Sequence, residues 1–405
     1  MIVRARVVLT MEDAPIENGA IAIDGAFITG VGTFSEIKAR NKGEVLDLGE
    51  QTLLPGLINA HCHLDYTILR GQIPRQPSFA EWIRQINSAR ADLSEEDYLG
   101  SIAAGFAEAQ RFGTTTIINL EAFPELLARI LPSPLRTWWC AELIDIRKRV
   151  EPADVVQAMR AAAEQRGHLV GGFGLAPHAP YTASAELYRQ CFELRRRENL
   201  LLTTHLAESH EEMEMFRSGG GPLFEFMESF GRRMNDCGSK TPLVFLLEET
   251  ELNEDWLIAH LNELTSDDFD RLATAKKFHV VHCPRSHRYF GHTAFPLQKL
   301  HELGFNISLG TDSLASNSDL SLFAEMQALR QEQPALAPKQ ILEMVTVDPA
   351  KALRLPRTLG HIRAGCFADL IALSDTAGGD IFEQVVSYQK PPSWMMIAGR
   401  VLDRI

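Results

Sequence analysis

Two histidines separated by a single residue end an apolar stretch near residue 60. The stretch runs from Leu53 to Thr67 and reads LLPGLINAHCHLDYT. Its first part predicts a strand buried on both faces. Alternate side chains of a strand point the same way, so His61 and His63 are expected side by side. Two imidazoles placed in this way can hold one divalent metal ion. The motif alone is a weak signal, because two polar residues can also mark where a strand leaves the core.

Further polar residues fall at the same kind of position, the end of a predicted strand. Seven more strands are predicted, at 113–119, 136–144, 168–175, 200–204, 256–259, 278–281 and 306–309. His178, His205, His260 and Asp312 each follow one of these strands closely. Helical stretches separate most of the strands, and eight such units indicate a parallel barrel with its site at the carboxyl ends of the strands. Scattered core histidines have no reason to collect there, so the sequence predicts a metal site.

The fold class that we expect is α/β, a (β/α)8 TIM-like barrel with a small β-sandwich domain built from both termini. The barrel is expected over residues 53–355. Residues 1–52 and 356–405 are expected to form the two parts of the small domain, because both predict short strands separated by turns. Residues 209–255 interrupt the barrel pattern. We interpret them as an excursion over the barrel mouth, either a lid or an oligomer contact, or as a surface loop with no special role.

Composition narrows the class of protein. The 405 residues carry a formal net charge of −13, which argues against nucleic acid or an anionic membrane as the main partner. The six cysteines lie far apart without a CxxC pair, a pattern typical of a reducing compartment. No apolar stretch reaches membrane-spanning length. We expect a cytoplasmic protein that acts on a small-molecule substrate and assembles as a homo-oligomer, a dimer.

Five motifs, in order, carry a resemblance to a known family. PGLINAHCH, THLAES, AHLNEL, GTDSLASN and the closing GCFADLIAL together resemble the amidohydrolase superfamily over essentially the whole chain. PHAPYT and GTDSLASN are most similar to its metal-dependent aminohydrolase branch. That branch includes S-adenosylhomocysteine and methylthioadenosine deaminases, guanine deaminase and triazine hydrolases. Within the branch, HCHLDYT and HCPRSHRYF look most like aminodeoxyfutalosine deaminases.

The resemblance implies a metal site. It makes His61, His63, His205 and Asp312 the ligands of one divalent ion, zinc or alternatively iron. Three neutral imidazoles and one carboxylate leave such a cation with net positive charge, which acidifies a bound water. Relatives with two metal ions carry a carboxylated lysine at the end of the fourth strand. Here that strand end carries His178 and no lysine, so a single ion is expected.

The resemblance also implies catalytic roles. Glu208 would protonate a ring nitrogen, His260 would hydrogen-bond the attacking water, and Asp312 would pass the proton of that water to the leaving amine. An exposed acid in the first turn of a helix is the ordinary alternative for Glu208. His178 would orient the substrate. Glu81, in the segment SFAEW, matches a glutamate that binds ribose in nucleoside deaminases, although an ordinary carboxylate at a helix start explains it equally well.

The remaining candidates for substrate contact lie near strand ends. His287 stands where relatives usually have asparagine in an HxPxSN motif, and Arg285 lies beside it. Arg147 and Arg149 follow the third strand. Any of the three arginines could bind a substrate carboxylate with two hydrogen bonds, although each could also be a solvated surface charge. Ser316, in GTDSLASN, is a further candidate contact.

These features favour a metal-dependent hydrolytic deaminase of an aminopurine nucleoside-like substrate. An adenosine derivative such as aminodeoxyfutalosine or S-adenosylhomocysteine would be the substrate, and ammonia would be released. A second hypothesis keeps the site but changes the ring, as in a guanine, pterin or cytosine deaminase or a triazine chlorohydrolase. An inactive scaffold barrel is a third, but such descendants typically lose ligands, and every ligand is present here.

Overall fold

A parallel β-sheet forms the centre of the molecule. The computed structural model describes residues 1–166, 171–374, 376 and 378–402. The sheet has nine strands in the order β13-β12-β11-β10-β9-β8-β7-β6-β14. Their bounds are β6 (Leu57–His63), β7 (Thr114–Glu121), β8 (Arg136–Leu143), β9 (Gly171–Pro177), β10 (Leu201–Leu206), β11 (Trp256–His260), β12 (His279–His282), β13 (Asn306–Leu309) and β14 (Asp312–Ser313). The strand expected at 168–175 starts outside the described residues, and its described part is β9.

The two ends of this sheet are consecutive in the chain. β13 pairs with β12 and β14 pairs with β6, and only Gly310 and Thr311 separate β13 from β14. The sheet therefore curls on itself, which is consistent with the expected TIM-like barrel. A Cβ on Gly310 would lie 2.7 Å from the carbonyl oxygen of His61. Glycine is thus required where the last strand passes the first.

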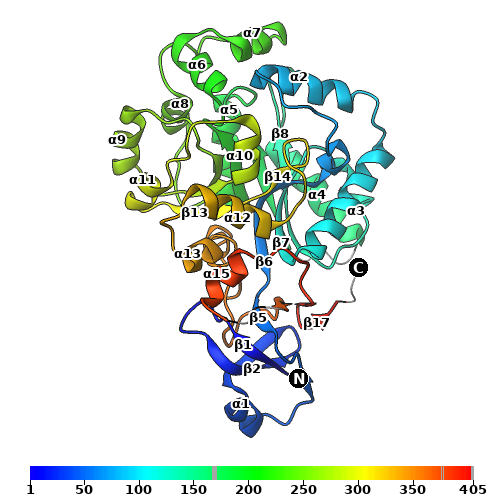
Figure 1. Ribbon diagram of the computed structural model, residues 1–405. Coiled ribbons are helices and arrows are strands. Elements are labelled where there is room, and N and C mark those ends of the chain that lie inside the picture. The colour runs from blue at the N-terminus through cyan, green and yellow to red at the C-terminus, as the bar shows by residue number, and fades with distance from the viewer. Residues whose placement is uncertain (167–170, 375, 377, 403–405) are drawn as a thin grey trace.

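Helices alternate with most of these strands and surround the sheet (Figure 1). α3 begins directly after Ser94, because Ser94 and Asp97 form a reciprocal capping box. The helices of this layer are η1 (Leu64–Leu69), α2 (Phe79–Arg90), α3 (Glu95–Arg111), η2 (Pro124–Ala128), α4 (Pro152–Arg166), α5 (Ala185–Arg197), α9 (Ser266–Thr274), α10 (Pro284–Phe290), α11 (Leu297–Glu302), α12 (Leu322–Glu332), α13 (Pro338–Glu343) and α14 (Val347–Ala352).

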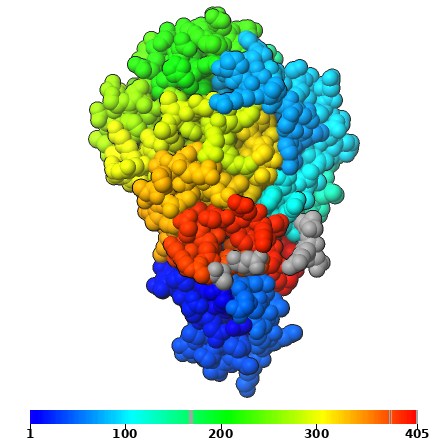
Figure 2. All heavy atoms as spheres, viewed as in Figure 1, coloured from blue at the N-terminus to red at the C-terminus, as the bar shows by residue number. Residues whose placement is uncertain are grey.

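A second sheet joins the two ends of the chain. Its order is β17-β16-β15-β5-β1-β2-β3, with β4 paired to β1. The elements are β1 (Ile2–Val8), β2 (Ile16–Asp24), β3 (Phe27–Thr33), α1 (Phe34–Arg40), β4 (Val45–Asp47), β5 (Thr52–Pro55), β15 (Leu370–Leu373), α15 (Ile381–Val386), β16 (Trp394–Ile397) and β17 (Arg400–Val401). The N-terminal part forms the narrow end of the molecule (Figure 2). The two termini share this one sheet, whereas a separate β-sandwich is not confirmed.

The apolar run that starts at Leu53 is divided between the two sheets. β5 pairs with β1 and β15 in the terminal sheet, and β6 belongs to the central sheet. Pro55 and Gly56 lie at the break. The N–H of Gly56 donates to the carbonyl of Asp369, and a Cβ here would lie 2.1 Å from Thr115. Apolarity alone could not reveal this break, because both halves are buried.

The excursion at residues 209–255 is helical. It contains α6 (His210–Ser218), α7 (Pro222–Ser229) and α8 (Pro242–Glu249). α6 and α7 lie with α2 at the end of the molecule opposite the terminal sheet (Figure 1). Among the helices that the structure describes, none is both long enough and apolar enough to span a membrane.

Candidate active site

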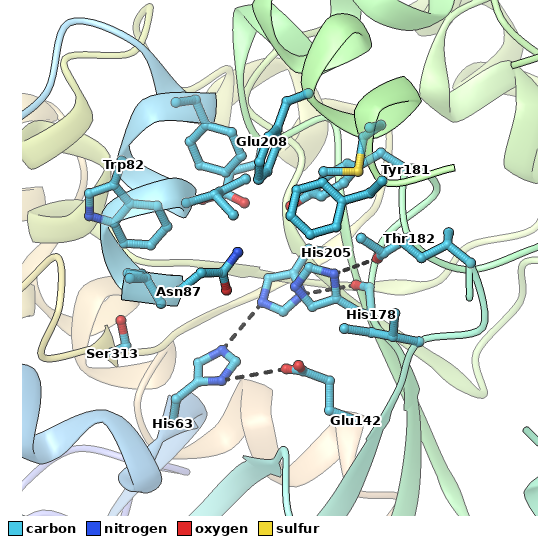
Figure 3. A pocket seen from close by; sticks show the side chains of 18 of the residues that line it. His63, Trp82, Asn87, Glu142, His178, Tyr181, Thr182, His205, Glu208 and Ser313 are labelled. Atoms are coloured by element: carbon cyan, nitrogen blue, oxygen red, sulfur yellow. Dashed lines mark hydrogen bonds and ion pairs between the residues drawn. The ribbon is translucent and has the colours of Figure 1, made fainter. Parts of the chain in front are cut away.

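Four side chains at strand ends meet in one buried cluster. His61 and His63 end β6, His205 lies near the end of β10, and Asp312 begins β14. Ligand atoms of His61, His63 and Asp312 all lie within 4.8 Å of one another. The Nε2 atoms of His63 and His205 are 3.3 Å apart, and a dashed line marks this contact in Figure 3. The strand-end argument therefore brings together the four residues proposed as metal ligands.

The donor set of this cluster fits a divalent cation. Both ring nitrogens of His61 are buried and lack a hydrogen-bond partner among the described residues. Burial, and then neighbouring histidines, hold the pKa of His63 well below its usual value and that of His205 at about 3. Both rings are therefore neutral, as metal ligands must be. A buried nitrogen without a partner costs free energy unless an ion or a water satisfies it.

Asp312 is ionised and held from two sides. Its Oδ1 lies 3.7 Å from Nε2 of His61 and 3.9 Å from Nε2 of His63. Its Oδ2 accepts a 2.6 Å hydrogen bond from Ser286, whose hydroxyl is also 2.8 Å from that of Ser316. Burial opposes ionisation, but the close approach of His61, and then of His260 and His63, holds the pKa of Asp312 well below its usual value.

Hydrogen bonds behind the cluster fix the orientation of His205. Its Nδ1 lies 2.9 Å from the carbonyl oxygen of His178. Because a carbonyl can only accept, Nδ1 carries the proton and the lone pair of Nε2 points into the cluster. His63 has a carboxylate on its outer side, with Nδ1 3.9 Å from Oε2 of Glu142 (Figure 3).

Glu208 and His260 lie beside the metal-ligand candidates. Nε2 of His260 is 3.7 Å from Oε1 of Glu208, and both groups approach Asp312 within 4.8 Å. Burial, and then the Asp312 charge, raise the pKa of Glu208 well above its usual value. Glu208 therefore keeps its proton to a higher pH than an exposed glutamate does, which suits it to act as a general acid. His260 and Asp312 have positive φ angles of 73° and 56°, the kind of local strain that gathers at functional sites.

A cavity of about 330 Å³ opens onto this cluster. His63, His205, Glu208, His260 and Asp312 contribute to its wall. α2 contributes Trp82 and Asn87 on one side, and the segment after β9 contributes Tyr181 and Thr182 on the other (Figure 3). The excursion adds Phe226, Met227 and Phe230. Part of residues 209–255 therefore forms cavity wall, so it is more than a surface loop.

Two of the seven residues expected to contact substrate line this cavity, His178 and Arg147. Nδ1 of His178 is 2.6 Å from the hydroxyl of Thr182, so Nε2 remains for a substrate. Burial lowers the pKa of His178 to about 4, so the ring is neutral. The guanidinium of Arg147 lies over the Phe230 ring, 4.2 Å from its centroid.

The other five expected contacts lie outside the residues that line this cavity. Glu81 is half-exposed in the first turn of α2, 3.6 Å from Arg84. Arg149 is exposed and pairs with Glu151. Arg285 pairs with Asp319 at 2.6 Å. His287 packs against His282 and His292, and Ser316 lies behind Asp312.

Several cavity residues were not identified from the sequence. Glu142 could have been identified, because it lies near the end of a predicted strand, as the proposed metal ligands do. Arg90 could not have been identified, because tertiary packing decides which face of α2 turns toward the cavity. Its guanidinium donates to the hydroxyls of Tyr66 and Tyr98 and lies over the Tyr66 ring. Lys148, next to Arg147, adds a further cation.

Comparisons with known proteins agree with this architecture. The model of the amidohydrolase family matches residues 52–402. A 5-methylthioadenosine/S-adenosylhomocysteine deaminase of Pyrococcus furiosus is 31% identical over 387 residues, covering 92% of this chain and 86% of the relative. A 5'-deoxyadenosine deaminase of Methanosarcina barkeri is 31% identical over 393 residues, covering 92% and 84%.

Solved structures share the fold. An aminofutalosine deaminase of Helicobacter pylori in complex with methylthio-coformycin superposes with a TM-score of 0.85 at 22% identity, over 99% of this chain and all of the other. An adenosine deaminase of Xanthomonas campestris with bound zinc gives a TM-score of 0.84 at 23% identity, over 99% and 92%.

Proposed function

This chain belongs to the amidohydrolase family and is a hydrolytic deaminase of an adenosine derivative, and we propose that this derivative carries a carboxylate on its tail. The observation that carries the proposal is the position of Arg147. It lines the cavity, and no carboxylate of the described residues lies within ion-pair distance of it. An arginine without an acidic partner beside a substrate cavity is suited to bind a carboxylate with two hydrogen bonds.

We further propose that His61, His63, His205 and Asp312 hold a single divalent ion, zinc. When bound, the ion would acidify a water and so supply the nucleophile of hydrolysis. His178, rather than a lysine, follows β9, which supports one ion rather than two. The buried, unpartnered nitrogens of His61 are the structural support for an ion at this place.

The surrounding side chains would handle the protons. Protonated Glu208 would donate to the ring nitrogen next to the carbon that bears the amine, which makes that carbon more electrophilic. Nε2 of His260 is buried without a hydrogen-bond partner among the described residues, so it can orient the attacking water. Ionised Asp312 would accept a proton from that water and return it to the amine, which leaves as ammonia. Ser286 would keep the accepting carboxylate in place.

The cavity wall also favours an aromatic tail. Trp82, Phe226 and Phe230 all line the cavity. Flat aromatic walls pack well against planar groups. A substrate with an adenine at one end and an aromatic carboxylate at the other would use both ends of the cavity. Aminodeoxyfutalosine has these features, whereas S-adenosylhomocysteine offers the carboxylate without the ring, so we propose the former as the preferred substrate.

A substrate panel with two matched variants tests this proposal. Metal-loaded protein is given adenosine, 5'-deoxyadenosine, methylthioadenosine, S-adenosylhomocysteine and aminodeoxyfutalosine, and ammonia release is measured. Arg147→Met should raise the KM for the carboxylate-bearing substrates by about ten- to a hundredfold, the size of a charge-assisted hydrogen bond. It should leave adenosine turnover nearly unchanged.

The control is Arg149→Met, because Arg149 is exposed and already paired with Glu151. This variant should behave like the wild type with every substrate. If adenosine or methylthioadenosine is the best substrate, or if both variants have the same effect, the carboxylate proposal fails while the deaminase assignment stands.

A further inference from the structure

Glu208 lies in a segment with irregular backbone, between the end of β10 and the start of α6. The residue before it, Ala207, has a positive φ of 49°. The peptide groups of Glu208 therefore gain no support from a regular strand or helix. A general acid must be placed to within a fraction of an ångström of the atom that it protonates. Contacts from other residues must supply that placement.

Two buried side chains hydrogen-bond to the backbone of Glu208, one to its N–H group and the other to its carbonyl. Its N–H donates to Oε2 of Glu212 at 2.8 Å, and its carbonyl accepts from Nδ2 of Asn262 at 3.0 Å. Glu212 is fully buried and Asn262 is 4% exposed. Both residues lie outside the lining of the cavity. They touch Glu208 without facing the substrate.

Glu212 and Asn262 belong to different parts of the fold. Glu212 is in the first turn of α6, where its own N–H donates to the hydroxyl of Ser209. Asn262 follows β11 and so lies two residues after His260. The N–H groups of Asn262 and Glu263 both donate to the carbonyl of Ala207 at 2.9 Å. The segment that carries His260 is thereby joined to the segment that carries Glu208.

We propose that Glu212 and Asn262 are positioning residues that hold the carboxyl of Glu208 at the reacting ring nitrogen and in register with His260. The proposal rests on the role of Glu208 in the proposed function. Oε1 of Glu212 is buried and has no hydrogen-bond partner among the described residues. A carboxyl kept in such a place is a poor choice for stability alone, because an apolar side chain would fill the space without the desolvation cost.

The test compares three variants of the metal-loaded enzyme. Glu212→Leu keeps the bulk but removes the acceptor, and Asn262→Asp keeps the shape but removes the amide donor. Both should lower kcat by about ten- to a hundredfold, the effect of a misplacement of about 1 Å, while KM and metal content stay unchanged. Glu212→Gln retains an oxygen that can accept from the N–H of Glu208, so its kcat should stay within a few-fold of the wild type.

The Glu208→Gln background separates positioning from a general structural role. Glu208→Gln cannot protonate the ring, and its kcat should fall by about a hundredfold or more. If Glu212 acts through Glu208, adding Glu212→Leu to this variant should change kcat little, because groups that act as a unit are not additive.

A full further loss in the double variant overturns the proposal, as does wild-type kcat in both Glu212→Leu and Asn262→Asp. Near wild-type activity of Glu208→Gln alone overturns the acid role of Glu208 and the positioning role together. If Glu212→Leu does not fold, Asn262→Asp and its double variant with Glu208→Gln decide the matter by the same criteria.

Discussion

The four residues proposed as metal ligands differ in how their polar atoms are held. Nδ1 of His205 donates to a carbonyl, Oδ2 of Asp312 accepts from Ser286, and Oδ1 of Asp312 faces His61 and His63. Both ring nitrogens of His61 have no hydrogen-bond partner among the described residues. Loss of one imidazole would remove a quarter of the ligands and also open the centre of the cluster.

We expect His205→Ala to lose the metal. Purified wild-type protein should contain about one divalent ion per chain by elemental analysis, and the variant should contain almost none, because three ligands bind a divalent ion far more weakly than four. His287→Ala is the control. His287 is also a buried histidine, but it packs against His282 and His292 away from the cavity wall. Two ions per chain, both needed for activity, would refute the single-ion assignment.

The sequence could predict that His61, His63, His205 and Asp312 meet, but not which side chains line the rest of the cavity. The four residues fall at strand ends, and strand ends can be located from apolar runs. Contacts from helices depend on which face turns inward. α2 lines the cavity with Phe79, Trp82, Ile83, Ile86, Asn87 and Arg90, which recur at helical spacing. Glu81 falls off that face and pairs with Arg84 instead.

At the level of elements, the neighbours β12 and β13 are joined by a polar pair. His279 lies opposite Asn306 in the register of the two strands, and Nδ1 of His279 accepts from Nδ2 of Asn306 at 2.9 Å. Burial, and then the charge of Lys351, lower the pKa of His279 to about 4. The neutral ring is therefore the form that the folded protein favours.

We expect this pair to make stability depend on pH. The pKa of His279 is lower in the folded protein than its ordinary value of about 6.5, so the unfolded chain binds the proton more readily. Its contribution, about 3 kcal/mol at most, is present above about pH 6.5 and is lost as the pH falls toward 4. In His279→Gln, which can still accept from Asn306, the thermal midpoint should fall less between pH 7.5 and pH 5 than in the wild type. Parallel curves would show that His279 does not contribute.

Element boundaries were predictable where a local signal existed. Ser94 and Asp97 have the spacing of a capping box, which is typical of a helix start, and in the structure they form one before α3. The break between β5 and β6 lacks such a signal, because the partners that divide the run, β1 and β15, lie far away in the sequence. Long-range pairing decided that boundary, and only the folded chain contains it.

At the level of the whole molecule, the terminal sheet and the central sheet meet at a buried ion pair. Arg136 begins β8, and Asp369 precedes β15. Their side chains are 7% and 4% exposed, with Nε 3.0 Å from Oδ2. The Arg136 guanidinium also lies over the Phe367 ring, and Asp369 accepts from the N–H of Ala398 at 2.7 Å. Short strands at both ends of the sequence predicted a shared unit. Whether they would form one sheet or two depended on pairings that no local pattern encodes.

We expect Asp369→Asn to destabilise the protein without affecting catalysis. The variant keeps the shape but leaves Arg136 buried without its counter-charge, which typically costs about 3 kcal/mol or more. Arg136 lies six residues before Glu142 in the same strand. At about 3.3 Å per residue the ion pair is therefore about 20 Å from the cavity, and kcat and metal content should equal those of the wild type. The thermal midpoint and ammonia release are the two measurements.

The matched control is Asp47→Asn. Asp47 pairs with Arg4 at 2.9 Å within the terminal sheet, but its side chain is 56% exposed. Exposed pairs contribute less than about 1 kcal/mol, so this variant should melt close to the wild type. If the thermal midpoint of Asp369→Asn is also close to that of the wild type, the buried pair does not hold the two sheets together. If Asp369→Asn keeps the thermal midpoint of the wild type but loses activity, the terminal sheet influences the site over about 20 Å. The central sheet then cannot be treated as an independent catalytic unit.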